Sequence, residues 1–151
     1  MNLASESVFS EYATVVDESW IDYNGHMSEA YYVLVFGFAT DAAMDRLGLD
    51  ADYRQRTRCS LYTVEAHVRY LAEVSLGQSL TVRTVLAGHG AKKVHLAHEM
   101  YCGEQLVATE EILGLHVEQQ SGRSVALPDA AQDAARRAAA DPPSWCGRRV
   151  G

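Results

Sequence analysis

The segment WIDYNGHMSEAYY (residues 20–32) places an acid, two turn-forming residues and a histidine just before an apolar run. Asp22 could act as a general base on water or attack a carbonyl carbon directly. Gly25 tolerates a positive φ and lets the backbone approach a ligand. The unpaired amides that open the following helix could stabilise an oxyanion, and we expect them between Gly25 and Ser28.

The same residues also have structural explanations. Asp22 could simply cap its own turn, and Asn24 is a typical turn residue. His26 could orient the acid, donate to a carbonyl group or only bond to its neighbours. The local sequence therefore leaves a catalytic and a capping role for Asp22 open.

A long helix is predicted over residues 29–47, with Ser28 as its N-cap and Gly48 as its stop. Its first half is apolar nearly all round, which predicts burial. Strands are predicted over residues 9–17, 61–74, 79–88, 93–102 and 106–119, the last four with a period of two and short glycine-containing connections. These four strands predict an antiparallel meander. We expect an α+β fold in which a five-stranded antiparallel sheet wraps around one long central helix, partly covered by a second subunit.

The 151 residues favour one folded domain, over residues 9–120. Residues 1–8 are expected to be loose. Residues 121–151 are expected to form a linker, a short alanine-rich helix over residues 129–140 and a frayed tail.

The composition excludes several classes of function. A formal net charge of −7 argues against a general nucleic-acid or anionic-membrane binder. The longest apolar run, residues 30–39, is too short to cross a bilayer, and the N-terminus has no features of a signal peptide. We therefore expect a soluble cytoplasmic protein.

The cysteines and histidines predict no metal and no other cofactor. Three widely spaced cysteines make neither a disulfide framework nor a zinc motif. His95 and His98 fall on opposite faces of one predicted strand, so they are poor joint ligands.

The strand, the D-x-x-G-H turn, the buried helix and the four further strands resemble the hotdog fold. Over residues 9–120 the chain is similar to acyl-CoA thioesterases related to 4-hydroxybenzoyl-CoA thioesterase. The segments WIDYNGHMSEAYYVLVFGFATDAAMDRLGLDADYR and CSLYTVEAHVRYLAEV are more similar still to betainyl-CoA thioesterases of carnitine breakdown.

The resemblance implies that the chain hydrolyses an acyl-CoA thioester to a free acid and CoA, with betainyl-CoA favoured. The family's catalytic acid maps onto Asp22, as base or nucleophile, and its turn glycine maps onto Gly25. Ser28 stands where the family often has asparagine. The resemblance also implies a homodimer or tetramer, with sheets joined edge to edge and active sites at the subunit interface.

A betainyl group carries a quaternary ammonium, which aromatic faces bind. The candidates near the turn in sequence or by strand adjacency, each with ordinary packing as the alternative, are Trp20, Tyr23, Tyr31, Tyr32 and Tyr62. Trp20 and Tyr23 are preferred because they flank Asp22.

Three further residues have candidate roles. Lys92 and Lys93 could hold the phosphates of CoA, although surface charge is the ordinary explanation. Glu65 is the reserve acid, because another branch of hotdog enzymes uses a glutamate. Two other functions stay open: a hydratase or dehydratase, in which His26 matters more than Asp22, and a non-catalytic acyl-CoA binding protein.

Overall fold

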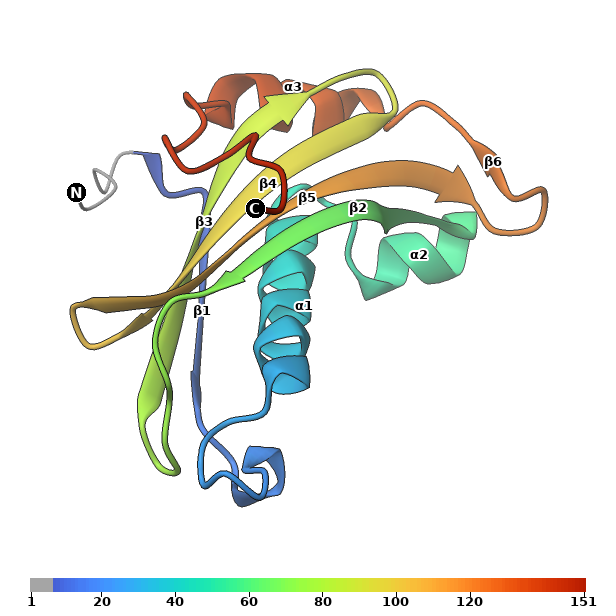
Figure 1. Ribbon diagram of the computed structural model, residues 1–151. Helices are drawn as coiled ribbons and strands as arrows, with labels where there is room; N and C mark the ends of the chain where they lie inside the picture. The colour runs from blue at the N-terminus through green and yellow to red at the C-terminus, as the bar shows by residue number, and fades with distance from the viewer. Residues whose placement is uncertain (1–6) are drawn as a thin grey trace.

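The computed structural model describes residues 7–151. Figure 1 shows a curled antiparallel sheet with one long helix on its inner face. The strands are β1 (Ser10–Val15), β2 (Cys59–Tyr70), β3 (Ser79–His89), β4 (Lys93–Cys102), β5 (Gln105–Glu118) and β6 (Arg123–Ser124). The helices are the 3-10 turn η2 (Glu18–Trp20), α1 (Glu29–Arg46), α2 (Ala51–Thr57) and α3 (Asp129–Ala138).

The five predicted strands and the long helix are all present, with ends within a few residues of the expected ones. The strand order is β1-β3-β4-β5-β2, with the short β6 added beside β5. The expected four-strand meander is wrong in one connection, because β2 pairs with β5 and not with β3. The segment that connects β2 to β3 therefore runs from the β2 edge of the sheet, past β5 and β4, to β3.

This crossing segment, residues 71–78, lies under the start of α1. Val74 is fully buried, and its carbonyl oxygen accepts the amide of Met27 at 2.8 Å. The Gly77 amide donates to Val16 at the end of β1, 3.2 Å away. The segment thus ties the turn before α1 to the sheet, which fixes where the turn can lie.

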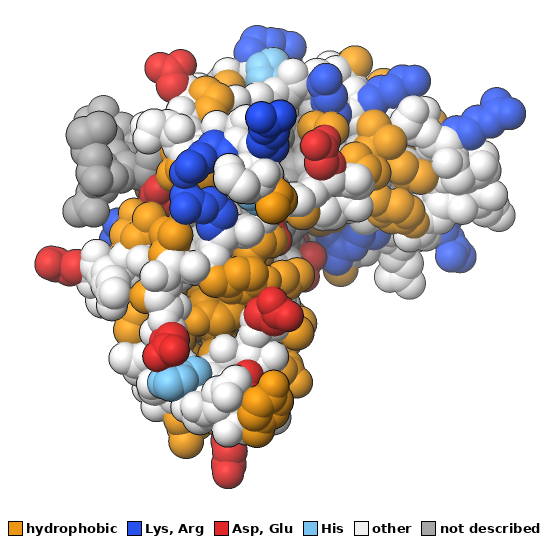
Figure 2. Space-filling model, viewed as in Figure 1, with side chains coloured by type: hydrophobic (Ala, Val, Ile, Leu, Met, Phe, Trp, Pro, Cys, Tyr) orange, Lys and Arg blue, Asp and Glu red, His pale blue; other side chains and the backbone are white. Residues whose placement is uncertain are grey.

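Helix α1 buries only one side against the sheet. Its buried residues are Tyr32, Val35, Phe36, Ala39, Ala43 and Met44. Val33 and Leu34 remain 45% and 39% exposed, so the expected burial all round is not reached within one chain. Figure 2 shows apolar side chains on the face that α1 and β2 present to the viewer.

Sequence reasoning missed helix α2 and treated residues 50–60 as irregular. The Asp50 side chain caps this helix by accepting the Tyr53 amide at 2.9 Å, and Tyr53 is its one buried residue. A seven-residue helix with so little buried surface gives a weak periodic signal.

The expected short C-terminal helix is present as α3, whereas the tail that was expected to fray is held against the sheet. Helix α3 packs into the core through Ala131 and Ala135. The tail beyond α3 then lies on the outer face of the sheet, where the Trp145 indole N–H donates to Glu99 Oε2 at 2.8 Å. None of the helices in residues 7–151 has the length and apolar character needed to cross a membrane.

Candidate active site at the start of helix α1

The turn that carries Asp22 is closed by backbone hydrogen bonds. The Asp22 amide donates to the His26 carbonyl and the Gly25 amide donates to the Asp22 carbonyl, each at 3.0 Å. Gly25 has a φ of 83°, a conformation that side chains with a Cβ rarely adopt. Glycine at this position therefore lets the chain reverse direction just before α1.

The Asp22 carboxylate is oriented by its own turn. Its Oδ1 accepts the Asn24 amide at 2.8 Å, which is the capping contact foreseen as the structural explanation. Oδ2 has no hydrogen-bond partner among residues 7–151, and the side chain is half-buried. One oxygen is thus held while the other can accept a proton or attack a carbonyl carbon.

Some backbone amides around the turn donate hydrogen bonds within the chain, and others have no acceptor there. Those of Gly25, Met27 and Ser28 donate to carbonyl oxygens within the chain. The amides of Glu29 and Ala30 open α1 and point along its axis without an acceptor in the helix. The His26 amide, inside the expected stretch from Gly25 to Ser28, also has no acceptor among residues 7–151. The candidate oxyanion donors are therefore the amides of His26, Glu29 and Ala30.

His26 faces a residue that sequence reasoning did not select. Its Nε2 lies 3.2 Å from Glu73 Oε2, on the segment that crosses under α1. The Glu73 side chain is 76% exposed, so this pair contributes little to stability. It does place a second carboxylate beside the turn.

A groove of about 430 Å³ opens next to these residues, between the start of α1 and the end of β2. Its lining includes Tyr32 and Tyr70, whose rings meet edge to face at 5.2 Å. The Tyr32 hydroxyl donates to the Ala72 carbonyl at 2.9 Å. Burial and the charge of Glu73 raise the pKa of Tyr32, so its hydroxyl stays protonated.

The five aromatic candidates do not form one cluster, and Tyr32 alone among them lines the groove. Trp20 and Tyr31 stack with ring centroids 6.0 Å apart. Tyr23 is 97% exposed. Tyr62 lies on β2 and is 41% exposed, opposite Leu115 and far along the strand from the Tyr70 end that borders the groove.

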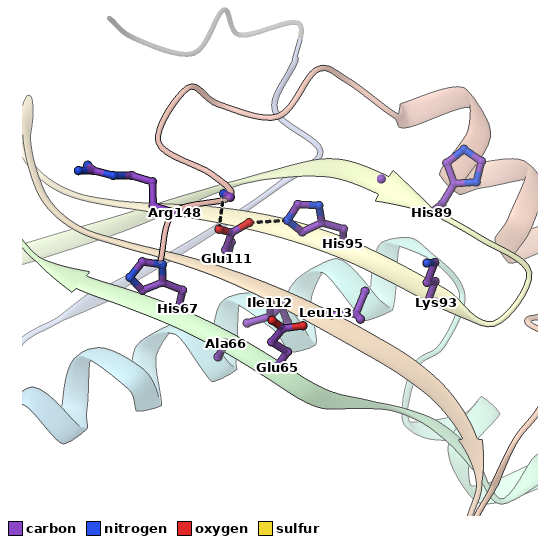
Figure 3. Close-up of a pocket in the computed structure, with 12 residues that line it drawn as sticks. Glu65, Ala66, His67, His89, Lys93, His95, Glu111, Ile112, Leu113 and Arg148 are labelled. Atoms are coloured by element: carbon purple, nitrogen blue, oxygen red, sulfur yellow. Dashed lines mark hydrogen bonds and ion pairs between the residues drawn. The ribbon is translucent and has the colours of Figure 1, made fainter. Parts of the chain in front are cut away.

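Glu65 and Lys93 line a different cavity, of about 490 Å³, on the outer face of the sheet (Figure 3). His67, His95 and Glu111 lie on the same face. Lys92 is exposed beside Lys93. Within one chain, these residues are therefore separated by the sheet from the groove beside Met27 and Glu73, whose lining does not include Asp22.

One buried acid on the inner face was also missed. Glu110 is 5% exposed and sits in register with His98, whose ring stacks on Phe36 of α1. Burial raises the pKa of Glu110 to about 7. The alternation Ala108, Glu110, Ile112 along β5 was the available signal, because residues two apart share a face.

Comparisons with known proteins agree with this architecture. The family model described as "Thioesterase-like superfamily" matches residues 16–135. A "hypothetical protein" of Staphylococcus aureus, solved in complex with CoA, superposes with a TM-score of 0.88 at 25% identity and covers 100% of this chain and 99% of that one. The expected hotdog fold is confirmed.

Two relatives carry names that describe an activity. "Betainyl-CoA thioesterase" of Pseudomonas aeruginosa is 43% identical over 120 residues, which are 78% of this chain and 75% of that protein. "L-carnitine dehydrogenase/betainyl-CoA thioesterase" of Agrobacterium fabrum is 48% identical over 116 residues. That match covers 76% of this chain but only 24% of the Agrobacterium protein.

Proposed function

This chain belongs to the thioesterase-like superfamily, and from that premise we propose that it is an acyl-CoA thioesterase with betainyl-CoA as its favoured substrate. The observation that carries the proposal is the arrangement at the start of α1. There a carboxylate with one fixed and one free oxygen lies in the turn that leads directly into the unpaired amides opening the helix.

In the proposed reaction the thioester carbonyl oxygen points at the amides of Glu29 and Ala30. One well-aimed donor of this kind lowers the barrier by roughly 3 kcal/mol. Asp22 Oδ2 takes a proton from water while the water oxygen attacks the carbonyl carbon, or attacks that carbon itself to form an anhydride that water then opens. On either route the C–S bond breaks, the thiolate of CoA leaves and takes up a proton, and the free acid remains.

The surroundings of the turn favour a cationic acyl group. The side chains of Glu29 and Glu73 border the groove, and both are exposed. The stacked pair of Trp20 and Tyr31 adds aromatic faces, each worth about 0.5–2 kcal/mol to a quaternary ammonium. Negative charge and aromatic surface together suit a betainyl group better than a neutral acyl chain.

We further propose that two copies pair through β2, the edge strand of the sheet. Its exposed apolar residues include Tyr62, Val64 and Tyr70, at 41%, 54% and 45%. A strand of 12 residues with such an edge is a template for pairing with another chain. Antiparallel pairing with a second β2 would form one continuous sheet and cover the exposed residues of α1.

This pairing gives the lysine candidates a role across the interface. Lys93 pairs with Leu115 of β5, and Leu115 pairs with Tyr62 of β2. Lys93 is therefore level with the end of β2 that lies farthest from the Asp22 turn. Antiparallel pairing places that end of the partner beside this chain's Tyr70 end. The partner's Lys93 would then lie at the level of this chain's groove but on the outer face of the continuous sheet, so the phosphates of CoA could reach it only around the ends of the strands.

The proposal is tested by measuring thiol release from a panel of acyl-CoAs. We expect betainyl-CoA to be hydrolysed with the highest kcat/KM and Asp22→Asn to lose the activity. Water addition or loss without thiol release would identify a hydratase, and binding without turnover would identify an acyl-CoA binding protein. Either outcome would overturn the thioesterase proposal.

A further inference from the structure

Three donor side chains of different chemistry meet on the outer face of the sheet. His95 comes from β4, Glu111 from β5 and Cys146 from the C-terminal tail. One ligand atom from each lies within 4.8 Å of the other two. All three residues are half-buried, and the proposed hydrolysis uses none of them.

The cluster is held in place from two sides. His95 Nε2 and Glu111 Oε2 are 2.8 Å apart, and Figure 3 shows these two side chains directed at one another. The other oxygen of the same carboxylate, Oε1, accepts the Gly147 amide at 2.6 Å. Together with the bond from Trp145 to Glu99, this contact places Cys146 over the sheet.

The donor set is typical of a transition metal. Imidazole, thiolate and carboxylate all bind zinc at about 2.0–2.3 Å, so ligand atoms around one ion lie ~3–4 Å apart. The observed spacing of up to 4.8 Å closes to that value with side-chain shifts of about 1 Å. His67 stands opposite Glu111 in the sheet register and lines the same cavity, where it or water could occupy a fourth position.

A reactive cysteine explains the cluster less well. Burial, followed by the nearby charge of Glu111, raises the pKa of the Cys146 thiol to about 12. A thiol in this state is a poor nucleophile.

We propose that His95, Glu111 and Cys146 bind a divalent transition-metal ion of the zinc type, which fastens the C-terminal tail to the outer face of the sheet. On binding, the S–H bond of Cys146 breaks, a sulfur–metal bond forms and the proton leaves to solvent. The proton between His95 Nε2 and Glu111 Oε2 is also given up to solvent, and the neutral imidazole holds its single proton at Nδ1, so that Nε2 and Oε2 can coordinate.

The test is zinc binding by the full chain, measured in competition with a chromophoric chelator. We expect one Zn²⁺ per chain, with affinity reduced at least about tenfold in Cys146→Ser and in His95→Ala. Loading with Co²⁺ should give the intense near-ultraviolet band of a thiolate-to-cobalt transition, and Cys146→Ser should lack it. Zinc should also slow proteolysis of the tail in the wild type, but not in Cys146→Ser or His95→Ala.

His89→Ala is the matched control, because His89 lines the same cavity but lies outside the cluster. It should keep the wild-type affinity. Equal zinc affinity in the wild type and Cys146→Ser would overturn the proposal. So would an equal loss in His89→Ala, since the ion would then be held by the cavity's histidines in general. None of these measurements involves acyl-CoA, so they are independent of the thioesterase proposal.

Discussion

His26 Nε2 lies 3.2 Å from Glu73 Oε2, and this contact joins the Asp22 turn to the segment that crosses under α1. Both side chains are substantially exposed, so the pair matters more for local charge than for stability. Because Glu73 also lines the groove beside the start of α1, its carboxylate is placed to act on a charged acyl group.

Glu73→Gln should therefore raise KM for betainyl-CoA about fivefold, with little change for acetyl-CoA. The loss corresponds to roughly 1 kcal/mol, the attraction of two charges about 4 Å apart at a wet surface. Steady-state kinetics with both substrates measures the effect. Glu104→Gln, which removes an exposed charge from the β4–β5 turn, is the control. Equal changes for both substrates would show that Glu73 does not sense the acyl charge.

Trp20→Ala should raise KM for betainyl-CoA more than for acetyl-CoA, by about 2–30-fold, because one aromatic face is lost. Trp20→Phe keeps a ring next to Tyr31 and should retain most of the affinity. Thermal unfolding of both variants separates lost recognition from lost packing. The same loss for both substrates in Trp20→Ala would contradict a role in binding the cation.

Glu110→Gln should flatten the pH dependence of stability. Burial raises the pKa of Glu110 from 4.5 to about 7, so folding favours the protonated form. The stability due to this group is fully present below pH 4.5 and is lost as the pH rises through 7. Relative to the wild type, the variant should gain about 3 kcal/mol between pH 4 and pH 8.

Urea unfolding at several pH values measures this difference, with Glu104→Gln again as the exposed control. Parallel pH profiles for Glu110→Gln and the wild type would mean that the Glu110 carboxyl titrates normally in the folded protein.

Val64→Lys should weaken self-association, because it puts a charge in the middle of the apolar edge of β2. Val15→Lys, on β1 at the opposite edge of the sheet and 55% exposed, is the matched control. Sedimentation velocity should show a dimer or larger assembly for the wild type and the control. A wild-type monomer at micromolar concentration would contradict pairing through β2.

The sequence was sufficient to predict the elements around the site. The apolar run after Ser28 and the glycine in the turn predicted a helix that starts at Glu29, as observed, although the helix is buried on one side only. The pairing of β2 with β5 was not predictable from connection length, because residues 71–78 are short enough for a hairpin. Their actual course depends on Val74 being buried under α1.

The contacts between distant segments were the hardest to foresee. Glu73 meets His26 only because the crossing segment passes beneath the turn. Cys146 meets Glu111 only because the tail is anchored through Trp145. Composition and periodicity describe each segment alone, so they do not predict contacts between residues that are far apart in the sequence.

The most direct test of the account is thiol release from betainyl-CoA by Asp22→Asn. The substituted side chain keeps an oxygen that can accept the Asn24 amide, so the turn should persist and the thermal unfolding temperature should stay close to that of the wild type. Loss of the carboxylate should lower kcat at least about 100-fold. A kcat within about threefold of the wild-type value would contradict the central role assigned to Asp22.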